Sequence, residues 1–512
     1  MRVHLMSVDQ DFDPHQPLPT NASALMEDLE LEMLLTTMAA GDRFLYDVAK
    51  TALLSSLTEP DAIRYRQDIL RDCLNHPSVV RDIYGLTVES VETKKRQWLG
   101  VFSRYPSAIL QNAIRLLKML VGLLARLRHI ADQRADTLQS EGFLTFFEMI
   151  RTELDDEFFA RVQEHLDELR FRDGVLLSME LGRGNEDIHH VLRKPRGPRH
   201  SRVGELIEMI SAFGRVINRG RSGYTFWIHP RDQAGARTLG ELKDTGVNLV
   251  ANALAQSADH IESFLKTLRV ELAFYVACLN LHERLTELDE PVTFSEPLRC
   301  DERAFSCVGL YDVCLALTMG RQIVGNDVQA DHKNLVIITG ANQGGKSTFL
   351  RSTGLAQLMM QCGMFVAAKS FRANVCEGLF THYRREEDAA MESGKLDEEL
   401  ARMSRIADSV AANSLLLFNE SFAATNEREG SEIAYQIISA LLDGRVKVFF
   451  VTHLYGLAHR FHSEGSNGTI FLRAERRLDG TRTFRMVEAE PQHTSYGQDL
   501  YWDVFSEGRH FG

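Results

Sequence analysis

A short stretch of the chain has the side chains and the spacing that phosphate binding requires. It reads Gly-Ala-Asn-Gln-Gly-Gly-Lys-Ser-Thr from Gly340 to Thr348. Its glycines allow several backbone N–H groups to point at one spot, where the positive end of a following helix dipole adds to them. Lys346 would reach the β and γ phosphates of a nucleotide, and the Ser347 hydroxyl would ligate Mg²⁺. The sequence therefore predicts a nucleotide-binding loop.

Such a loop must lie between a buried strand and a helix, and the flanking residues fit both. The apolar run Leu335–Thr339 predicts the strand, and a helix is expected from Lys346 to Met360. The predicted nucleotide-binding residues on this loop are Gly340, Asn342, Gly344, Gly345, Lys346, Ser347 and Thr348.

Two later strands end in side chains that suit hydrolysis. The apolar run Ser414–Phe418 leads into Asn419 and Glu420, and a third strand over Val446–Val451 ends near His453. In this position Glu420 would polarise an attacking water and His453 would hydrogen-bond the γ-phosphate. Two plainer interpretations stay open, since Glu420 could be a helix N-terminal carboxylate and His453 an ordinary histidine at a strand end.

This order of motifs resembles the ATPase domain of the MutS family of DNA mismatch-repair proteins. The loop is close to that family's own form, Glu420–Gly430 has the spacing that follows its second nucleotide motif, and Thr452-His453 resembles its histidine switch. Thr494–Gly497 resembles its late Ser-Tyr-Gly element, and the resemblance is strong from about Leu310 to Gly497. It implies an ABC-type P-loop ATPase domain with a parallel-containing sheet, in which ATP and Mg²⁺ are the cofactors. Lys346, Glu420 and His453 would be the catalytic residues, and Ser347, Asn419 and Glu420 would lie on the metal.

The chain departs from the family pattern at two places. Asn419 stands where the family usually has an aspartate, so this position brings no negative charge to the metal. The family's signature segment, which touches the nucleotide of the opposite subunit, usually carries a Ser-Thr-Phe run. Here the corresponding place is Glu392–Leu400, where Ser393, Gly394 and Lys395 are the candidate contacts.

Length and composition suit a large globular protein of several domains. The chain has 512 residues, of which 44% are apolar and 25% charged. Its seven cysteines are widely spread, which favours reduced thiols over disulfides or a metal site. The start of the chain has no apolar signal-peptide core, and no segment is expected to span a membrane. We therefore expect a cytoplasmic protein without a membrane partner.

A basic segment sets apart the middle of an otherwise acidic chain. Ten basic and three acidic residues lie between Arg193 and Arg237, although the formal net charge of the chain is −13. Phosphate backbones are bound by such clusters, and a solvated loop without a ligand is the alternative. The candidate DNA contacts are Arg193, Lys194, Arg196, Arg199, Arg202, Arg219 and Arg221.

Long helical patterns flank this basic segment. Phe143–Asp173 and Val247–Glu290 contain neither Gly nor Pro, and their apolar residues recur at helical spacing. Two long helices with a basic tip resemble the lever and clamp of the MutS family. The expected fold is thus α/β plus all-α, with a helical core (1–142), lever helices (143–298) carrying a clamp at about 174–237, and the ATPase domain (299–512). The first twenty or so residues leave no room for the family's mismatch-recognition and connector domains.

The resemblance implies an ATP-hydrolysing, DNA-binding clamp protein that works as a homodimer in DNA repair or recombination. Binding to branched or damaged DNA, or to repair partner proteins, is expected over direct mismatch recognition. Two alternatives stay open. Asn419 suggests a nucleotide-gated protein-interaction factor with little ATPase activity, and the acidic total suggests a protein-binding lever with no nucleic-acid role.

Overall fold

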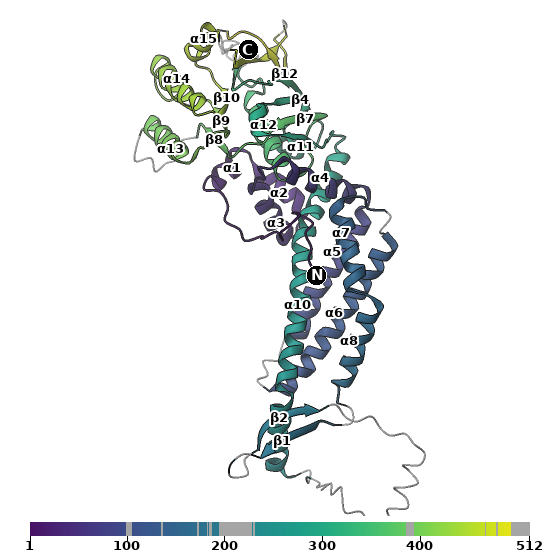
Figure 1. Ribbon diagram of the computed structural model, residues 1–512. Helices are drawn as coiled ribbons and strands as arrows, with labels where there is room; N and C mark the ends of the chain where they lie inside the picture. The colour runs from purple at the N-terminus through teal and green to yellow at the C-terminus, as the bar shows by residue number, and fades with distance from the viewer. Residues whose placement is uncertain are drawn as a thin grey trace, which may run out of the picture. The chain divides into compact units, whose positions relative to one another are not determined.

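The computed structural model describes residues 1–98, 105–134, 137–171, 174–181, 183, 187–193, 228, 231–385, 394–465, 467–477 and 480–492 (Figure 1). The chain divides into two compact units. The bundle unit comprises Met1 and residues 86–132 and 150–266, and the sheet unit comprises residues 2–85, 133–149 and 267–512. The three-domain division expected from the sequence stays a prediction.

The bundle unit consists mainly of long helices. They are the later part of α5 (Pro77–Trp98), most of α6 (Pro106–Arg134), α8 (Asp156–Glu168) and the earlier part of α10 (Gln233–Glu287). Ion pairs join Glu89 of α5 to Arg126 of α6 and Lys94 of α5 to Glu262 of α10. Strands β1 (Leu176–Leu181) and β2 (Asp187–Arg193) pair antiparallel. Long helices with a small β element agree with the expected fold class.

The prediction of one long helix over Phe143–Asp173 is wrong, because a first helix, α7 (Glu141–Glu153), ends within this range and a second follows. The Arg128 guanidinium of α6 takes up the last carbonyls of α7, donating to Arg151 at 2.9 Å and to Leu154 at 2.7 Å. Asp155 then starts α8 as an N-cap, accepting from the Phe158 N–H at 2.7 Å. The N-cap aspartate starts a new helix, so the break requires neither Gly nor Pro.

The second long helix is longer than predicted. Helix α10 begins at Gln233, whereas the sequence pattern placed its start at Val247. The added turns contain Gly235, Gly240 and Gly246, which the pattern counted against a helix. A glycine in a helix interior destabilises the helix by only about 1 kcal/mol relative to alanine. This cost is small enough for the other residues of α10 to offset it.

Helix α6 bears on the expectation that no segment spans a membrane. By length and composition it could cross a membrane, since its mean hydropathy reaches 1.5 over 18 residues. One such helix is weak evidence for a span, because a core helix has the same composition. The buried residues of α6 recur three and four positions apart from Leu110 to Ala131, which is typical of a helix packed in a bundle.

A six-stranded sheet forms the centre of the sheet unit. Its order is β12-β11-β6-β10-β9-β8, and every neighbouring pair is parallel except β11 with β12. The strands are β6 (Leu335–Gly340), β8 (Leu379–Tyr383), β9 (Leu415–Asn419), β10 (Lys447–Val451), β11 (Thr469–Arg476) and β12 (Arg482–Glu488). The three strands predicted around the nucleotide motifs are therefore confirmed within a residue or two.

Helices cover both faces of this sheet. On one face, α13 (Lys395–Ser409), α14 (Glu427–Asp443) and α15 (Tyr455–Ser463) share a core with Leu416, Phe418 and Phe450. On the other face lies α12 (Lys346–Gln361), where Gly354 packs against Leu417. This layering places the ends of the parallel strands in one row, which is where α/β sheets bind ligands.

Further elements of the sheet unit surround α12. A mixed sheet of order β3-β7-β4-β5 is built from β3 (Glu296–Leu298), β4 (Phe305–Leu310), β5 (Asn326–Gln329) and β7 (Ser370–Asn374). A 3₁₀ turn (Cys300–Glu302) and α11 (Val313–Met319) accompany it. Helices α1 (Ala22–Asp28), α2 (Leu31–Ala39), α3 (Arg43–Leu54) and α4 (Pro60–Asn75) also belong here. Helix α1 contacts β8 and α3 contacts α12, so the first helices of the chain pack beside the elements that carry the nucleotide motifs.

One buried carboxylate fastens the segment before α1 to the later part of α10. Glu271 accepts backbone N–H bonds from Leu5 at 2.5 Å, Met6 at 3.1 Å and Phe12 at 2.9 Å. Tyr275, one turn further along α10, donates its hydroxyl to the Leu5 carbonyl. Burial raises the pKa of Glu271 to about 7, although the three N–H donors oppose the rise.

This raised pKa predicts a pH dependence of stability. The folded chain holds the Glu271 proton more tightly than the unfolded chain, whose pKa is near 4.5. The protonated Glu271 therefore stabilises the folded chain. This stabilisation is fully present below pH 4.5 and is lost as the pH rises through about 7. We expect the free energy of unfolding of the parent, relative to Glu271→Gln, to fall by about 3 kcal/mol over this range in urea titrations. Glu287→Gln, on an exposed part of α10, should follow the parent, and a pH-independent difference between parent and Glu271→Gln would contradict the prediction.

Candidate nucleotide-binding site

The phosphate-binding loop joins the end of β6 to the start of α12, as the sequence predicted. Gly340 and Gly345 have φ angles of 111° and 88°, which glycine adopts without strain. A Cβ on Gly340 would also lie 2.9 Å from the backbone nitrogen of Ala474 in β11. The bend therefore requires glycine at both positions, and it turns the first N–H groups of α12 toward the loop.

Lys346 lies at the centre of this loop. Its Nζ donates to the carbonyl oxygens of Gly340 at 3.1 Å and Ala341 at 3.0 Å, and the side chain is buried. Burial lowers the pKa of Lys346, and the carboxylate of Glu420 opposes this change. A phosphate group would supply the negative charge that such a buried ammonium favours.

Oxygen atoms from two elements meet beside the loop. The Ser347 hydroxyl donates to Oδ1 of Asn419, at the end of β9, over 2.9 Å. Hydroxyl, amide and carboxylate oxygens are the ligands that Mg²⁺ takes. Ser347, Asn419 and Glu420 therefore fit a Mg²⁺ ion next to a bound nucleotide. The amide of Asn419 is neutral, so we expect it to hold the ion less firmly than an aspartate would.

Glu420 and His453 form a pair at the ends of two adjacent strands. The parallel register sets Asn419 opposite Val451, so the residues that follow these two strands come side by side. Nε2 of His453 lies 2.7 Å from Oε1 of Glu420, and both side chains are 29% exposed. The hydrogen bond from His453 is the largest cause that lowers the pKa of Glu420. An ionised Glu420 only accepts hydrogen bonds, so Nε2 of His453 carries the proton.

A cavity of about 680 Å³ opens over the loop. Asn342 to Thr348 and Glu420 line one side of it. The rest of the lining contains the polar residues Arg321, Gln322 and Asn326 and an apolar wall, which consists of Leu315, Met319, Ile323, Val324 and Phe484. Phosphates at the loop and a base against the apolar wall would fill such a cavity. The sequence did not predict this wall, because it joins residues 315–324 to Phe484, which is distant in the chain, and no local pattern marks either part.

Phe484 is the aromatic residue of this wall, and 48% of its surface is exposed. Stacking of a base on an aromatic ring contributes about 1–3 kcal/mol. We therefore expect Phe484→Ala to weaken binding of a fluorescent ATP analogue by about 5- to 150-fold. Phe484→Tyr keeps the ring and should bind like the parent. Equal affinity of the alanine variant and the parent would exclude Phe484 from the base site.

The structure brings most of the predicted site residues together. Gly340, Asn342, Gly344, Gly345, Lys346, Ser347 and Thr348 lie on the loop and the first turn of α12, and Asn419, Glu420 and His453 follow the neighbouring strands. Gly394 is the N-cap of α13, and Lys395 is its first residue. Ser393 and Thr494–Gly497 lie outside the described residues, so their roles stay predictions.

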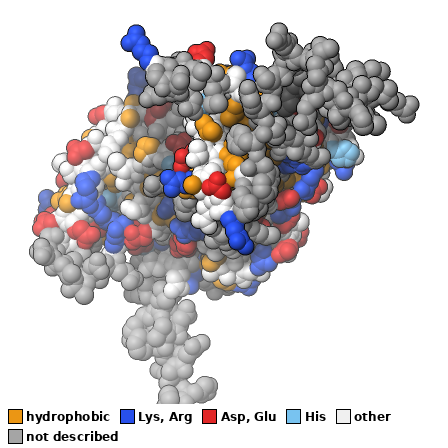
Figure 2. Space-filling view, turned by 90° about the horizontal axis from the view of Figure 1, so that it is seen from below, with side chains coloured by type: hydrophobic (Ala, Val, Ile, Leu, Met, Phe, Trp, Pro, Cys, Tyr) orange, Lys and Arg blue, Asp and Glu red, His pale blue; other side chains and the backbone are white. Residues whose placement is uncertain are grey.

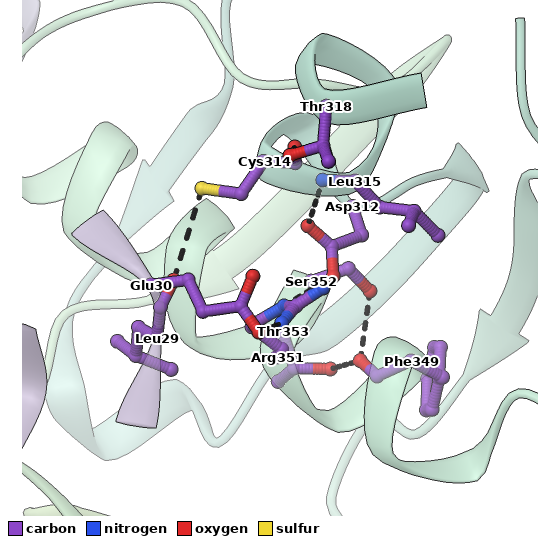
Figure 3. A network of polar contacts seen from close by, with 10 residues as sticks. All are labelled: Leu29, Glu30, Asp312, Cys314, Leu315, Thr318, Phe349, Arg351, Ser352 and Thr353. Atoms are coloured by element: carbon purple, nitrogen blue, oxygen red, sulfur yellow. Dashed lines mark hydrogen bonds and ion pairs between the residues drawn. The ribbon is translucent and has the colours of Figure 1, made fainter. Parts of the chain in front are cut away.

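A charged network fixes the helix that follows the loop. Arg351 of α12 pairs with Glu30, between α1 and α2, and its Nε lies 2.5 Å from Oδ2 of Asp312 (Figure 3). The Asp312 side chain is fully buried, and it also caps α11 by accepting from the Leu315 N–H at 3.0 Å. Because Leu315 and Met319 of α11 line the cavity, the network ties the phosphate-loop helix to the apolar wall. No sequence pattern predicted this link.

The predicted DNA contacts fall mostly on residues that the structure does not describe. Arg193 is exposed at the end of β2, and its Nε donates to the Ser178 hydroxyl of β1 over 2.8 Å. Lys194, Arg196, Arg199, Arg202, Arg219 and Arg221 lie outside the described residues. On the face shown in Figure 2, described Lys and Arg side chains lie among Asp and Glu side chains. The DNA contacts therefore stay predictions.

Two protein families match this chain. The family described as MutS2 N-terminal domain matches residues 58–288, and MutS domain V matches residues 336–501. The first range runs from α4 to the end of α10, and the second includes the phosphate loop, Glu420 and His453. MutS domain V is an ABC-type ATPase domain, so its match accounts for the loop, the parallel strands and the cavity.

Individual relatives match over a smaller part of their own length. The DNA mismatch repair protein MutS of Thermotoga neapolitana is 31% identical over 44% of this chain and 29% of its own length. The protein of the same name from Thermus aquaticus is 30% identical over 45% of this chain and 28% of its own. MutS protein homolog 4 of Homo sapiens is 26% identical over 48% of this chain and 26% of its own length. The matched part thus spans less than a third of these relatives. With both family matches covering most of the chain, the protein belongs to the MutS family and combines a MutS2-type N-terminal domain with a MutS domain V ATPase domain.

Proposed function

We propose that this protein hydrolyses ATP to ADP and phosphate, and that the nucleotide cycle drives a dimeric clamp that binds DNA. The observation that carries the ATPase part is the Glu420–His453 pair, held at 2.7 Å beside the phosphate loop. A carboxylate held beside the phosphate loop suits the activation of a water molecule that attacks a γ-phosphate bound at Lys346.

Each residue of the site has a distinct role in this proposal. Lys346 neutralises charge on the β and γ phosphates, and Ser347 and Asn419 orient oxygen ligands for Mg²⁺, which when bound stabilises phosphate charge. One oxygen of Glu420 is held by Nε2 of His453, so the other is free to accept the proton of the attacking water. His453 thereby fixes the direction of the carboxylate.

DNA binding and dimerisation rest on the sequence and on the relatives. The basic segment from Arg193 to Arg237 suits contacts to a phosphate backbone, and two of the relatives are named as DNA mismatch repair proteins. We propose a homodimer that acts in the cytoplasm in DNA repair or recombination, together with repair partner proteins. The seven free cysteines agree with a reducing compartment.

The test is the ATP hydrolysis rate with and without duplex, mismatched and branched DNA. The proposal expects hydrolysis by the parent protein and stimulation by at least one of these DNAs. A variant with Arg193, Arg196, Arg199 and Arg202 changed to glutamate should lose retention on branched DNA across a salt series. Unchanged retention would contradict the clamp, whereas absent hydrolysis would contradict the ATPase.

Asn419 favours a second candidate function. Its neutral amide takes the place of a charged metal ligand, so turnover could be slow enough for ATP to act as a switch. The protein would then be a nucleotide-gated interaction factor. An Asn419→Asp variant distinguishes the two functions, because a gain of tenfold or more in hydrolysis would indicate a parent built mainly to bind ATP.

A further inference from the structure

The turn that carries Glu420 has an unusual backbone. Glu420 and Phe422 have φ angles of 55° and 61°, so two residues with side chains adopt the left-handed conformation on either side of Ser421. Each such residue costs about 1–2 kcal/mol, and the conformation persists only where surrounding contacts enforce it. The direction of the Glu420 carboxylate therefore depends on whatever holds this turn.

Contacts from three neighbouring elements hold the turn. The Glu420 N–H donates to the Val451 carbonyl of β10 at 2.9 Å. The Ser421 hydroxyl donates to the carbonyl of His382, in β8, at 2.6 Å. The Phe422 N–H donates to Oε2 of Glu399, in α13, at 2.7 Å.

The His382 ring joins these contacts into one network. It stacks on the Phe422 ring with centroids 5.3 Å apart, and Nε2 lies 3.0 Å from the Glu399 carbonyl. Burial lowers the pKa of His382 to about 4, so the ring is neutral near pH 7. A carbonyl only accepts, so Nε2 carries the single ring proton. Nδ1, 2.7 Å from the Ser421 hydroxyl, is then an acceptor, and one hydroxyl proton is shared between Nδ1 and the His382 carbonyl.

Burial makes this network sensitive to the loss of any member. Ser421, Phe422 and His382 are fully buried, and Glu399 is 5% exposed. Removing the Glu399 carboxylate would leave the Phe422 N–H without its acceptor inside the protein, and removing the Ser421 hydroxyl would free the turn from β8. Neither side chain lines the nucleotide cavity, so ATP binding does not depend on them directly.

We propose that Glu399 of α13, with Ser421 and His382, is a positioning set that fixes the Glu420 carboxylate for hydrolysis. Helix α13 then acts on the rate of hydrolysis through the turn rather than on nucleotide affinity. The inference rests on the proposed role of Glu420. It also gives α13, which begins directly after Gly394, a contact route to the hydrolytic residue.

The experiment compares kcat, KM and affinity for a fluorescent ATP analogue in a small set of variants. Ser421→Ala and Glu399→Met should lower kcat by at least tenfold and leave KM and affinity within about threefold. Glu399→Gln keeps an oxygen acceptor for the Phe422 N–H and should restore most of kcat. Asp408→Asn, exposed on the same helix, should equal the parent.

Two further measurements separate positioning from a general structural role. In a Glu420→Gln background, adding Ser421→Ala should cause no further loss, because the set acts through Glu420. Hydrogen exchange of the Phe422 amide should speed up in Ser421→Ala and Glu399→Met but not in Glu399→Gln.

Parent-like kcat in both variants, or parallel loss of nucleotide affinity and hydrolysis, would overturn the inference. A failure of the proposed function looks different. In that case the parent hydrolyses ATP no faster than Glu420→Gln, while the exchange measurement still decides whether the network holds the turn.

Discussion

The Glu420→Gln variant is expected to lose about 10²- to 10⁴-fold in kcat for ATP hydrolysis, the range that a positioned general base contributes. Glutamine keeps the size of the side chain and an oxygen that accepts from Nε2 of His453, but it takes up no proton. Nucleotide affinity should stay close to that of the parent, since Lys346 and the loop are untouched. Phosphate release under single-turnover conditions and titration with a fluorescent ATP analogue measure the two quantities separately.

A matched substitution controls for the change of charge. Glu432→Gln removes an exposed carboxylate on α14 that pairs with Arg460 and should hydrolyse ATP like the parent. If the parent releases phosphate no faster than Glu420→Gln, Glu420 is not the base and the ATPase proposal is lost.

The largest expected effect on stability follows from Arg351→Met. Methionine fills much of the same volume but leaves the fully buried Asp312 carboxylate without its guanidinium partner. Removing one member of a buried ion pair typically costs about 3–5 kcal/mol, because the remaining charge is uncompensated. Urea unfolding followed by circular dichroism should show this loss in the transition of the sheet unit.

The double variant Arg351→Met with Asp312→Asn tests the cause of that loss. Asparagine removes the charge and still caps α11, so most of the stability should return. Arg43→Met breaks an exposed pair with Asp47 and should change stability by less than about 0.5 kcal/mol. Equal losses in the single and double variants would show that packing, and not the unpaired charge, causes the effect.

The sequence predicted the loop and the strands around the candidate nucleotide site because their signals are local. The apolar runs that became β6, β9 and β10 are each followed directly by their functional residues, and strand order brings those ends together. A short apolar run that ends in a polar residue predicts a buried strand of a parallel sheet, whatever the rest of the chain does. The fold class follows from the same local patterns.

The features that the sequence did not predict depend on partners distant in the chain. Arg128 ends α7 by binding carbonyls that lie more than twenty positions later, and no window around Phe143–Asp173 contains that information. Only Asp155, followed by two further acidic residues, was a usable sign of a new helix. The apolar wall and the Asp312–Arg351 pair likewise join segments that only the folded sheet unit brings together.

The bonds from Leu5, Met6 and Phe12 to Glu271 change how the amino end of this protein should be handled. Deleting the first twelve residues would expose to water a part of α10 that is now buried. It would also remove the three N–H donors of the Glu271 carboxylate. Because Val3, Leu5 and Met6 are buried, this segment contributes to the core of the sheet unit. An affinity tag at this end therefore needs a spacer, so that Val3 and Leu5 can still be buried in the folded protein.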